Sequence, residues 1–302
     1  MLAIVALVGL AACDAAVVNL PDRPVTPPPA ATVPSAESLA VKAYMARVQA
    51  DLLAQGMLRT DGGGPDTPFD ARGLTETFIR VAMFDEFTRS GSGFIAQESV
   101  SRLRRWAAPV RVGLNFGASV PPERQATDRA RIGSYLARLS RLTGHPILLS
   151  DTAANFQIFI VNEDERRALG PVIRQSLPTM TDAELAGLTS LPRSNYCVVY
   201  GFSQGGSNTY SRAVAVLRAE NPDLVNLLCV HEEIAQGLGL VNDSPKARPS
   251  IFNDDQEFAL LTRQDELLLR ILYDARLRPG MKVDEARPIV QAIATELLGL
   301  DS

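Results

Sequence analysis

The chain has 302 residues, of which 46% are hydrophobic and 21% are charged. This composition is typical of a globular protein and excludes a wholly disordered chain. Thirty Lys and Arg residues against 34 Asp and Glu residues leave a formal net charge of −4. A protein that coats nucleic acid needs a basic surface, so we expect no nucleic acid among its partners. The two histidines, His145 and His231, are too few for a three-histidine metal site.

The N-terminus reads MLAIVALVGLAAC. Its apolar run over residues 2–12 is shorter than the roughly 20 residues of a membrane-spanning helix and is typical of a secretory signal. The letters LAAC at positions 10–13 resemble a bacterial lipobox, in which small residues precede the cysteine that carries the lipid. The pattern predicts a lipoprotein signal peptide over residues 1–13. It also predicts a mature protein anchored through Cys13 on the periplasmic side of a cell membrane, the alternative being a frayed hydrophobic N-terminus.

The segment after the signal predicts a spacer and then a helix. Residues 14–35 form a proline-rich linker, because six prolines up to position 34 remove backbone donors and fix the backbone angle φ. From Ser38 to Gln55 the apolar residues recur at helical spacing, and the sequence DGGGPDTP at 61–68 ends that helix in a loop. We therefore expect an N-terminal helix and loop over residues 36–71 and a folded domain over residues 72–302.

Hydrophobic periodicity in the folded domain predicts helices and strands in mixed order, with a largely helical C-terminal third. Strands are expected at 105–114, 146–150, 156–162, 195–202 and 210–218. Helices are expected at 74–84, 127–142, 163–175, 182–188, 221–238, 262–273 and 283–298.

Two local signals bound the expected helices of the C-terminal third. Asn221 as the capping residue, with Pro222 at the first helical position, predicts the start of the helix at 221–238, and Gly239 predicts its left-handed end. Thr262 with Asp265 resembles a capping box for the next helix.

Two further cysteines, Cys197 and Cys229, fall in a predicted strand and a predicted helix. In an oxidising compartment the simplest pairing is one disulfide, which would tie that helix to the neighbouring sheet. The alternative is a pair of buried thiols.

The most informative segment is CVHEEIAQGLGLVNDS at residues 229–244. Metzincin zinc proteases carry HExxHxxGxxH on a helix that ends at the glycine, because ligands four residues apart share a helical face. A register that starts at Glu232 aligns Glu233 with the general base and Gly239 with the glycine. The three histidine positions then hold Glu232, Gln236 and Asn242.

The chain thus resembles a degenerate metzincin-like zinc protease domain. The resemblance implies an α+β fold: a zincin-like mixed sheet with an active-site-type helix and a helical C-terminal part. It makes Glu233 a vestigial base, and Glu232, Gln236 and Asn242 degenerate ligand positions. The same segment, together with SIFND and LLLRILYDARLRPGM downstream, resembles domain of unknown function family 2927, a family of predicted proteobacterial lipoproteins, over roughly residues 72–282.

The substitutions favour a non-catalytic domain. Zinc prefers imidazole and thiolate to a neutral amide oxygen, so we expect no bound metal and no cofactor. The preferred hypothesis is therefore a lipid-anchored protein that binds a peptide or an envelope component. The alternative is an active metal-dependent peptidase with unusual ligands, in which Glu233 acts as the base.

Two other residues invite a catalytic interpretation. Ser203 lies in the sequence GFSQG, which has the G-x-S-x-G form of a serine esterase, but the segment after it predicts a strand where a hydrolase needs a helix. A glycine- and serine-rich hairpin loop is the simpler interpretation. His231 falls on the apolar stripe of its predicted helix, so we expect it to pack in the interior, and His145 is expected to be structural.

Overall fold

The computed structural model describes residues 33–90, 93–203, 205–253 and 255–299. The expected signal peptide over residues 1–13, with Cys13, lies outside these ranges, as does most of the expected linker over residues 14–35. Across the described ranges, none of the helices combines the length and the apolar character that a membrane span requires.

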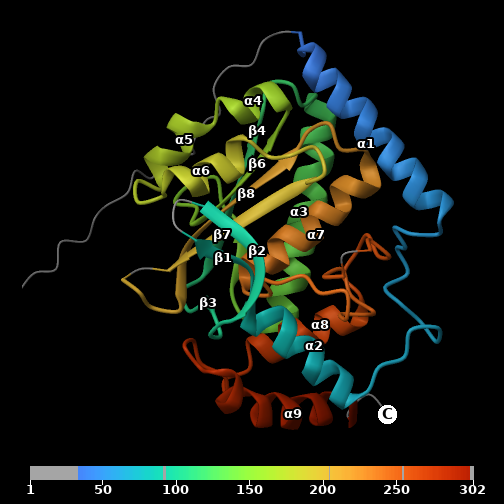
Figure 1. The fold of residues 1–302 in the computed structure, drawn as a ribbon, viewed down its shortest axis with the longest axis vertical. Helices are drawn as coiled ribbons and strands as arrows, with labels where there is room; N and C mark the ends of the chain where they lie inside the picture. The colour runs from blue at the N-terminus through green and yellow to red at the C-terminus, as the bar shows by residue number, and fades with distance from the viewer. Residues whose placement is uncertain (1–32, 91–92, 204, 254, 300–302) are drawn as a thin grey trace, which may run out of the picture.

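A mixed, mostly parallel sheet forms the centre of the molecule (Figure 1). The strand order is β3-β8-β6-β4-β5, with these strands parallel, and β7 pairs with β8 in the antiparallel sense. The bounds are β3 Arg105–Trp106, β4 Val110–Phe116, β5 Ile147–Leu149, β6 Phe156–Val161, β7 Cys197–Ser203 and β8 Thr209–Arg218. A separate antiparallel hairpin consists of β1 (Phe84–Ser90) and β2 (Gly93–Val100).

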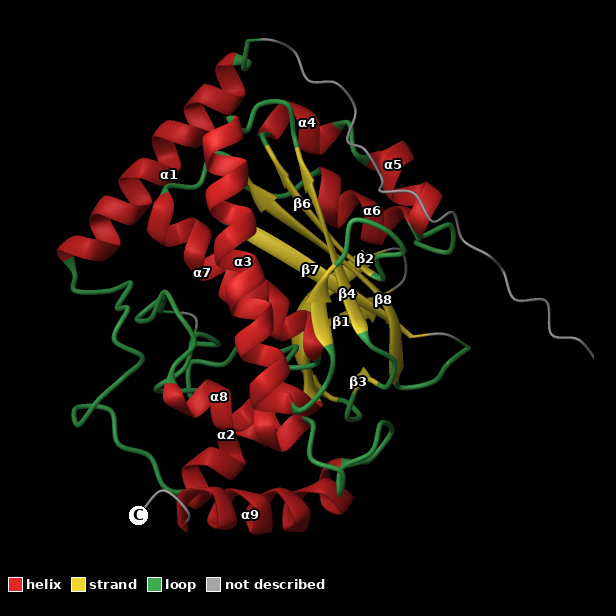
Figure 2. Ribbon diagram, turned by 180° about the vertical axis from the view of Figure 1, so that it is seen from behind, coloured by secondary structure: helices red, strands yellow, loops and turns green. Residues whose placement is uncertain are grey.

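Both faces of the sheet are buried. Because alternate residues of a strand point to opposite sides, each central strand contributes apolar side chains to both faces. In β8, Val214 and Val216 pack toward α5 and α6, whereas Ala215 and Leu217 pack on the other side. Figure 2 shows α3 and α7 lying along that second side. The bounds are α3 Pro122–Thr143, α4 Glu163–Arg167, α5 Gly170–Ser176, α6 Asp182–Thr189 and α7 Asp223–Leu238. The structure thus confirms the expected mixed α+β class.

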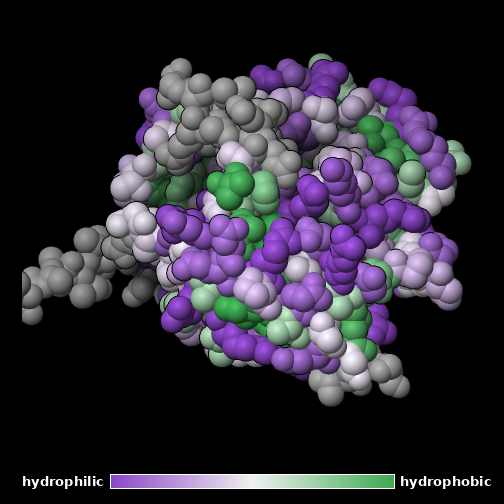
Figure 3. All heavy atoms as spheres, turned by 60° about the horizontal axis from the view of Figure 1, so that its bottom comes forward, coloured by the Kyte–Doolittle hydropathy of each residue, from purple (hydrophilic) through white to green (hydrophobic). Residues whose placement is uncertain are grey.

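The helical part expected near the C-terminus packs below the sheet (Figure 1). It consists of α8 (Arg263–Leu272) and α9 (Val283–Gly299), which both pack against α2 (Ala71–Met83). Thr262 and Asp265 form the predicted capping box at the start of α8. The face brought forward in Figure 3 is hydrophilic over most of its area, with small separate hydrophobic areas.

The N-terminal helix α1 (Ala36–Ala54) is joined to this body by polar contacts. The Ser38 hydroxyl donates to Glu220 Oε1 at 2.8 Å, and the backbone N–H of Ser35 donates to an Asp164 carboxylate oxygen at 2.9 Å. Near the other end of α1, Gln49 Oε1 accepts from the N–H groups of Leu224 and Val225 at 2.9 and 3.3 Å. A side chain of α1 therefore caps the start of α7.

The predicted capping role of Asn221 is wrong. The N-cap of α7 is Pro222, which has no side-chain hydrogen bond to offer. Asn221 instead turns its amide toward the backbone carbonyl of Tyr196 at 3.1 Å and toward Cys229 Sγ at 3.5 Å. The first N–H groups of a helix have no acceptor within the helix. For α7 that acceptor is Gln49 of α1, in place of an N-cap side chain.

Two predicted elements are each divided in the structure. The strand expected at 105–114 is β3 and β4, and β3 pairs with β8 whereas β4 lies between β5 and β6. Pro109, which has no N–H for a sheet ladder, stands in the break. The helix expected at 163–175 is α4 and α5, and α5 restarts with Pro171 in its first turn.

Removal of the Gln49 carboxamide should destabilise the fold through α7. We expect Gln49→Ala to lower the free energy of unfolding by about 1 kcal/mol, the usual cost of losing an N-cap acceptor. Urea denaturation monitored by circular dichroism measures the change. The matched control is Gln55→Ala, since Gln55 is exposed and, among the residues that the structure describes, its side-chain amide bonds only to Asp51 O of its own helix. Equal effects of the two substitutions would contradict the capping role.

Candidate functional site

Helix α7 directly follows β8 and carries the motif around Glu232. It ends at Gly239, where φ is +131° and a Cβ atom would lie 2.3 Å from the backbone oxygen of Arg104. Both the backbone angle and the close approach require glycine, so the predicted end of the helix is confirmed. The last carbonyls of the helix are also satisfied: Trp106 Nε1 donates to Gly237 O at 2.8 Å, and the Tyr273 hydroxyl donates to Leu238 O at 3.0 Å.

A disulfide joins Cys197, the first residue of β7, to Cys229 in the middle of α7. The Cα atoms of the two residues are 5.8 Å apart, within the normal range for a disulfide. The predicted pairing is therefore confirmed. It fixes α7 against the edge strand of the sheet.

Two carboxylates lie beside this disulfide. Glu232 and Glu233 are three and four residues after Cys229, so they share its helical face. One oxygen of each carboxylate and Cys197 Sγ lie within 4.8 Å of one another. Glu232 is partly exposed, whereas Glu233 is only 5% exposed. Burial raises the pKa of the neighbouring Tyr196, and the charge of Glu232 contributes to the same shift.

Gln236 and Asn242, the other two residues expected at degenerate ligand positions, have hydrogen-bond partners within the protein. Gln236 Nε2 donates to Asp243 Oδ1 at 3.0 Å, which links the last turn of α7 to the segment beyond the bend. Asn242 is 1% exposed, and its Nδ2 donates to the backbone carbonyl of Arg80 on α2 at 3.0 Å. The backbone N–H of Asn242 also donates to the carbonyl of Val81, at 3.0 Å. Hydrogen bonds within the protein thus hold the bend after Gly239.

His231 lies on the opposite side of α7 and packs in the interior, as predicted. Its ring stacks on Tyr135 with centroids 4.0 Å apart, and its Nδ1 accepts from the backbone N–H of Leu261 at 3.1 Å. Burial lowers the pKa of His231 to about 3, and the positive charge of Arg138 lowers it further. The imidazole is therefore neutral at pH 7. His145 is also structural, since its Nε2 bonds to the carbonyl of Ala108 at 3.0 Å.

Ser203 is the last residue of β7, and the strand that follows it, β8, returns antiparallel along β7. A nucleophile elbow needs a helix immediately after the serine. The hairpin expected here is therefore present, and the backbone of a serine esterase site is not formed around Ser203.

A buried network of charges was not foreseen from the sequence. Glu163 accepts from Arg166 and from Arg218, each at 2.6 Å, and all three side chains are less than 5% exposed. Although burial acts in the opposite direction, the hydrogen bonds from the arginines lower the pKa of Glu163 to about 2. Arg218 also donates to the carbonyls of Leu191 and Pro192 at 2.8 and 2.9 Å. The network joins the end of β8 to α4 and stabilises the fold.

A hollow of about 650 Å³ lies between α2 and the segments around residues 246–248 and 264. Its lining includes Phe69, Arg80, Lys246 and Gln264. Gln264 is 1% exposed; its Nε2 donates to Pro249 O, but its Oε1 is buried without a hydrogen-bond partner among the described residues. The side chains of Arg80 and Lys246 likewise make no ion pair within the described ranges. Sequence patterns could not reveal this hollow, because its residues come from separate segments.

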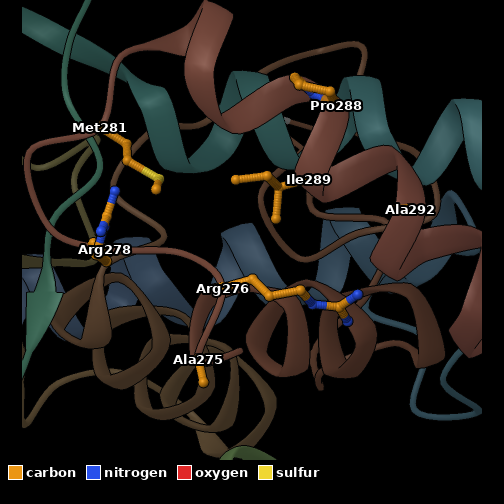
Figure 4. A pocket seen from close by; sticks show the side chains of 7 residues that line it. All are labelled: Ala275, Arg276, Arg278, Met281, Pro288, Ile289 and Ala292. Atoms are coloured by element: carbon orange, nitrogen blue, oxygen red, sulfur yellow. The ribbon is translucent and has the colours of Figure 1, made fainter.

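A second hollow, of about 600 Å³, lies between α9 and the segment 275–281 (Figure 4). Met281 and Ile289 point into it from opposite sides. Arg276 at its rim is engaged by the carboxylates of Asp274 and Glu296, at 2.9 and 2.8 Å. The lining of this hollow is mainly apolar, so it has fewer groups that could bind a polar ligand than the hollow beside α2.

The chain belongs to the family described as protein of unknown function DUF2927, whose sequence profile matches residues 71–292. The matched region begins with α2 and ends within α9, so it contains the sheet, α7, the hollow beside α9 and most of the lining of the hollow beside α2, and it leaves out α1. No curated protein and no solved structure is significantly similar to this chain.

The buried imidazole of His231 should make stability depend on pH. Its pKa is about 3 in the folded state against an ordinary 6.5, so between these values the unfolded chain binds the proton. We therefore expect this residue to reduce the free energy of unfolding by about 1.4 kcal/mol for each pH unit below 6.5. Asp265 acts in the opposite sense from about pH 3.8 to 6, because burial raises its pKa to about 6.

Comparison with a variant isolates the effect of His231. His231→Asn keeps an acceptor for Leu261 N–H and removes the titrating group. We expect it to be less stable at pH 7, through the lost ring stacking, and to lose less stability on acidification. Urea denaturation between pH 7 and pH 4.5 measures both, with His145→Asn as the control. Parallel pH profiles for wild type and His231→Asn would rule out the buried neutral imidazole.

Proposed function

We propose that this protein is a non-catalytic member of its family with a degenerate metallopeptidase-like domain, lipid-anchored on the periplasmic side of a membrane, which binds an acidic peptide or envelope protein. The observation that carries the non-catalytic part is the hydrogen bonding of Gln236 and Asn242. Each side chain donates to a fixed protein acceptor, Asp243 or the carbonyl of Arg80. A neutral amide offers a metal ion only its oxygen, which is a poor ligand for zinc, and these hydrogen bonds fix the orientation of both amides within the protein.

The arrangement of β8, α7 and the bend at Gly239 supports a metallopeptidase-like ancestry, because it matches the order that the motif implies. In an active enzyme of that kind, the metal holds the helix and the segment after the bend together. Here the Gln236–Asp243 hydrogen bond links the helix to the segment after the bend, and Asn242 fixes that segment to α2. The bend can therefore keep its shape with no ion.

The hollow beside α2 supports the binding part of the proposal. It adjoins the bend, since Asn242 bonds to the backbone of Arg80, a residue that lines it. The cations Arg80 and Lys246 fit carboxylates, and Phe69 offers an apolar surface. An extended acidic peptide with apolar residues satisfies both features.

Binding is tested with a fluorescein-labelled peptide of alternating glutamate and leucine, by fluorescence anisotropy. We expect Arg80→Ala with Lys246→Ala to weaken binding at least tenfold, equivalent to about 1.4 kcal/mol, because two cations are removed. The matched control is Arg72→Ala with Lys42→Ala, which removes the same charge from exposed positions outside the hollow. Equal losses in the two variants would show binding by general charge and would contradict the proposed site.

The non-catalytic part is tested on a peptide library with the disulfide-bonded protein. We expect wild type and Glu233→Gln to give the same background cleavage, with or without added zinc. Cleavage by the wild type that Glu233→Gln abolishes would overturn this part and favour the active metal-dependent peptidase.

Anchoring is tested by the fate of Cys13. We expect the full chain, expressed in a Gram-negative bacterium, to incorporate labelled fatty acid and to sediment with membranes. Cys13→Ala should lose the label and leave the membrane fraction, because the lipid supplies the membrane affinity. Membrane association and labelling that persist in Cys13→Ala would contradict the lipid anchor.

A further inference from the structure

The disulfide and the two carboxylates beside it bring together the side chains of a different kind of site. Cys197 comes from β7, and Cys229, Glu232 and Glu233 come from one face of α7. One oxygen of each carboxylate and Cys197 Sγ lie within 4.8 Å of one another, and Cys229 Sγ is bonded to Cys197. Two sulfur atoms and two carboxylates from two elements therefore meet at one place.

We propose that reduction of the Cys197–Cys229 disulfide creates a zinc site formed by both thiolates and by Glu232 and Glu233. In the disulfide each sulfur is bonded to the other and carries no thiolate charge, so the pair is a poor ligand. After reduction the four groups offer two thiolates and two carboxylates, which are zinc ligands. This ligand set differs from the degenerate ligand positions Glu232, Gln236 and Asn242, because only Glu232 belongs to both. The zinc site does not depend on the proposed peptide binding.

The chemistry balances with a dithiol as reductant. The dithiol transfers two electrons and two protons to the protein disulfide and becomes a disulfide itself. The S–S bond breaks, and Cys197 and Cys229 become thiols. Zn²⁺ then displaces both thiol protons, and two Zn–S bonds form. The bound ion leaves a net charge of −2 on the four-ligand set, the same as in a four-thiolate zinc site.

The geometry needs only local adjustment. Tetrahedral zinc with bonds of about 2.3 Å to sulfur and 2.0–2.2 Å to oxygen places its ligand atoms about 3.3–3.8 Å apart. The carboxylate oxygens and Cys197 Sγ, within 4.8 Å of one another, are close to this spacing, and side-chain rotation separates the two sulfurs once their bond is broken. Cys197 and Glu232 are partly exposed, which gives the reductant and the ion access, whereas Cys229 and Glu233 are buried behind them.

The ligand set also argues for the identity of the ion. Thiolates favour zinc over magnesium and calcium, which take oxygen ligands in larger numbers. The reduced protein should therefore select zinc, and cobalt(II) is a suitable spectroscopic substitute because thiolate bonds to cobalt give a charge-transfer absorption.

The experiment uses the full chain with Cys13→Ser, so that no third thiol contributes. The protein is reduced with dithiothreitol, freed of the reagent by gel filtration under argon, and titrated with Zn²⁺ against a competing chromophoric chelator and with Co²⁺. We expect one equivalent of zinc and a thiolate–cobalt band in the reduced protein, and neither in the oxidised protein. Glu232→Gln and Glu233→Gln should each weaken zinc binding at least tenfold, whereas Glu37→Gln, an exposed glutamate on α1, should not.

The outcomes separate this inference from its alternatives. Reduced protein that binds no zinc, or binds it equally well in Glu232→Gln and Glu233→Gln, overturns the inference. If reduction unfolds the chain, the return of the native circular dichroism on addition of zinc supports it, and failure to return overturns it. Zinc bound by the oxidised protein and lost in Gln236→Ala would instead contradict the non-catalytic function. Zinc bound only after reduction and kept in Gln236→Ala supports the site proposed here.

Discussion

The covalent bond between Cys197 and Cys229 fixes the position of α7, and the candidate site depends on that position. The bond spans a sequence separation of 32 residues, for which loop closure alone corresponds to about 3–4 kcal/mol of stabilisation. It holds the face of α7 that carries Glu232 and Glu233 next to the edge strand β7. On the opposite side of the helix, His231 stacks on Tyr135. One side of α7 therefore carries the two carboxylates beside the disulfide, and the other side carries the buried, neutral imidazole of His231.

The ends of α7 are held by contacts of a different kind. Gln49 of α1 accepts from the first N–H groups, and Trp106 and Tyr273 donate to the last carbonyls. At Gly239 the backbone passes so close to the carbonyl oxygen of Arg104 that a Cβ atom would not fit. These contacts place Asn242 against α2, next to the hollow that Arg80 and Lys246 line, so the bend and the hollow form one continuous region of the molecule.

Local patterns predicted much of the fold, because most elements are determined within a few turns of chain. The alternation in β8, the glycine after α7 and the Thr262–Asp265 capping box are examples. Long-range contacts could not be predicted in this way. The acceptor that caps α7 is 175 residues from Leu224 in the chain, and the two halves of the strand expected at 105–114 separate to different neighbours in the sheet.

The same division applies to the site. The four-residue spacing of Glu232 and Gln236 placed these two residues on one helical face, and the disulfide followed from the compartment expected for the protein. The partners of Gln236 and Asn242 and the unpaired Oε1 of Gln264 depend on how α2, α7 and the segment after the bend meet. No single segment carries that information, so the hollow emerges only from the folded chain.

The central claim is that hydrogen bonds, and no metal ion, hold the bend after α7. The most direct measurement is the thermal unfolding midpoint of the disulfide-bonded protein, as purified, with and without a strong zinc chelator. An ion bound to the folded state alone would raise that midpoint, and its removal would lower it. The account predicts the same midpoint in both samples. A fall of several degrees on chelation, reversed by added zinc, would contradict it.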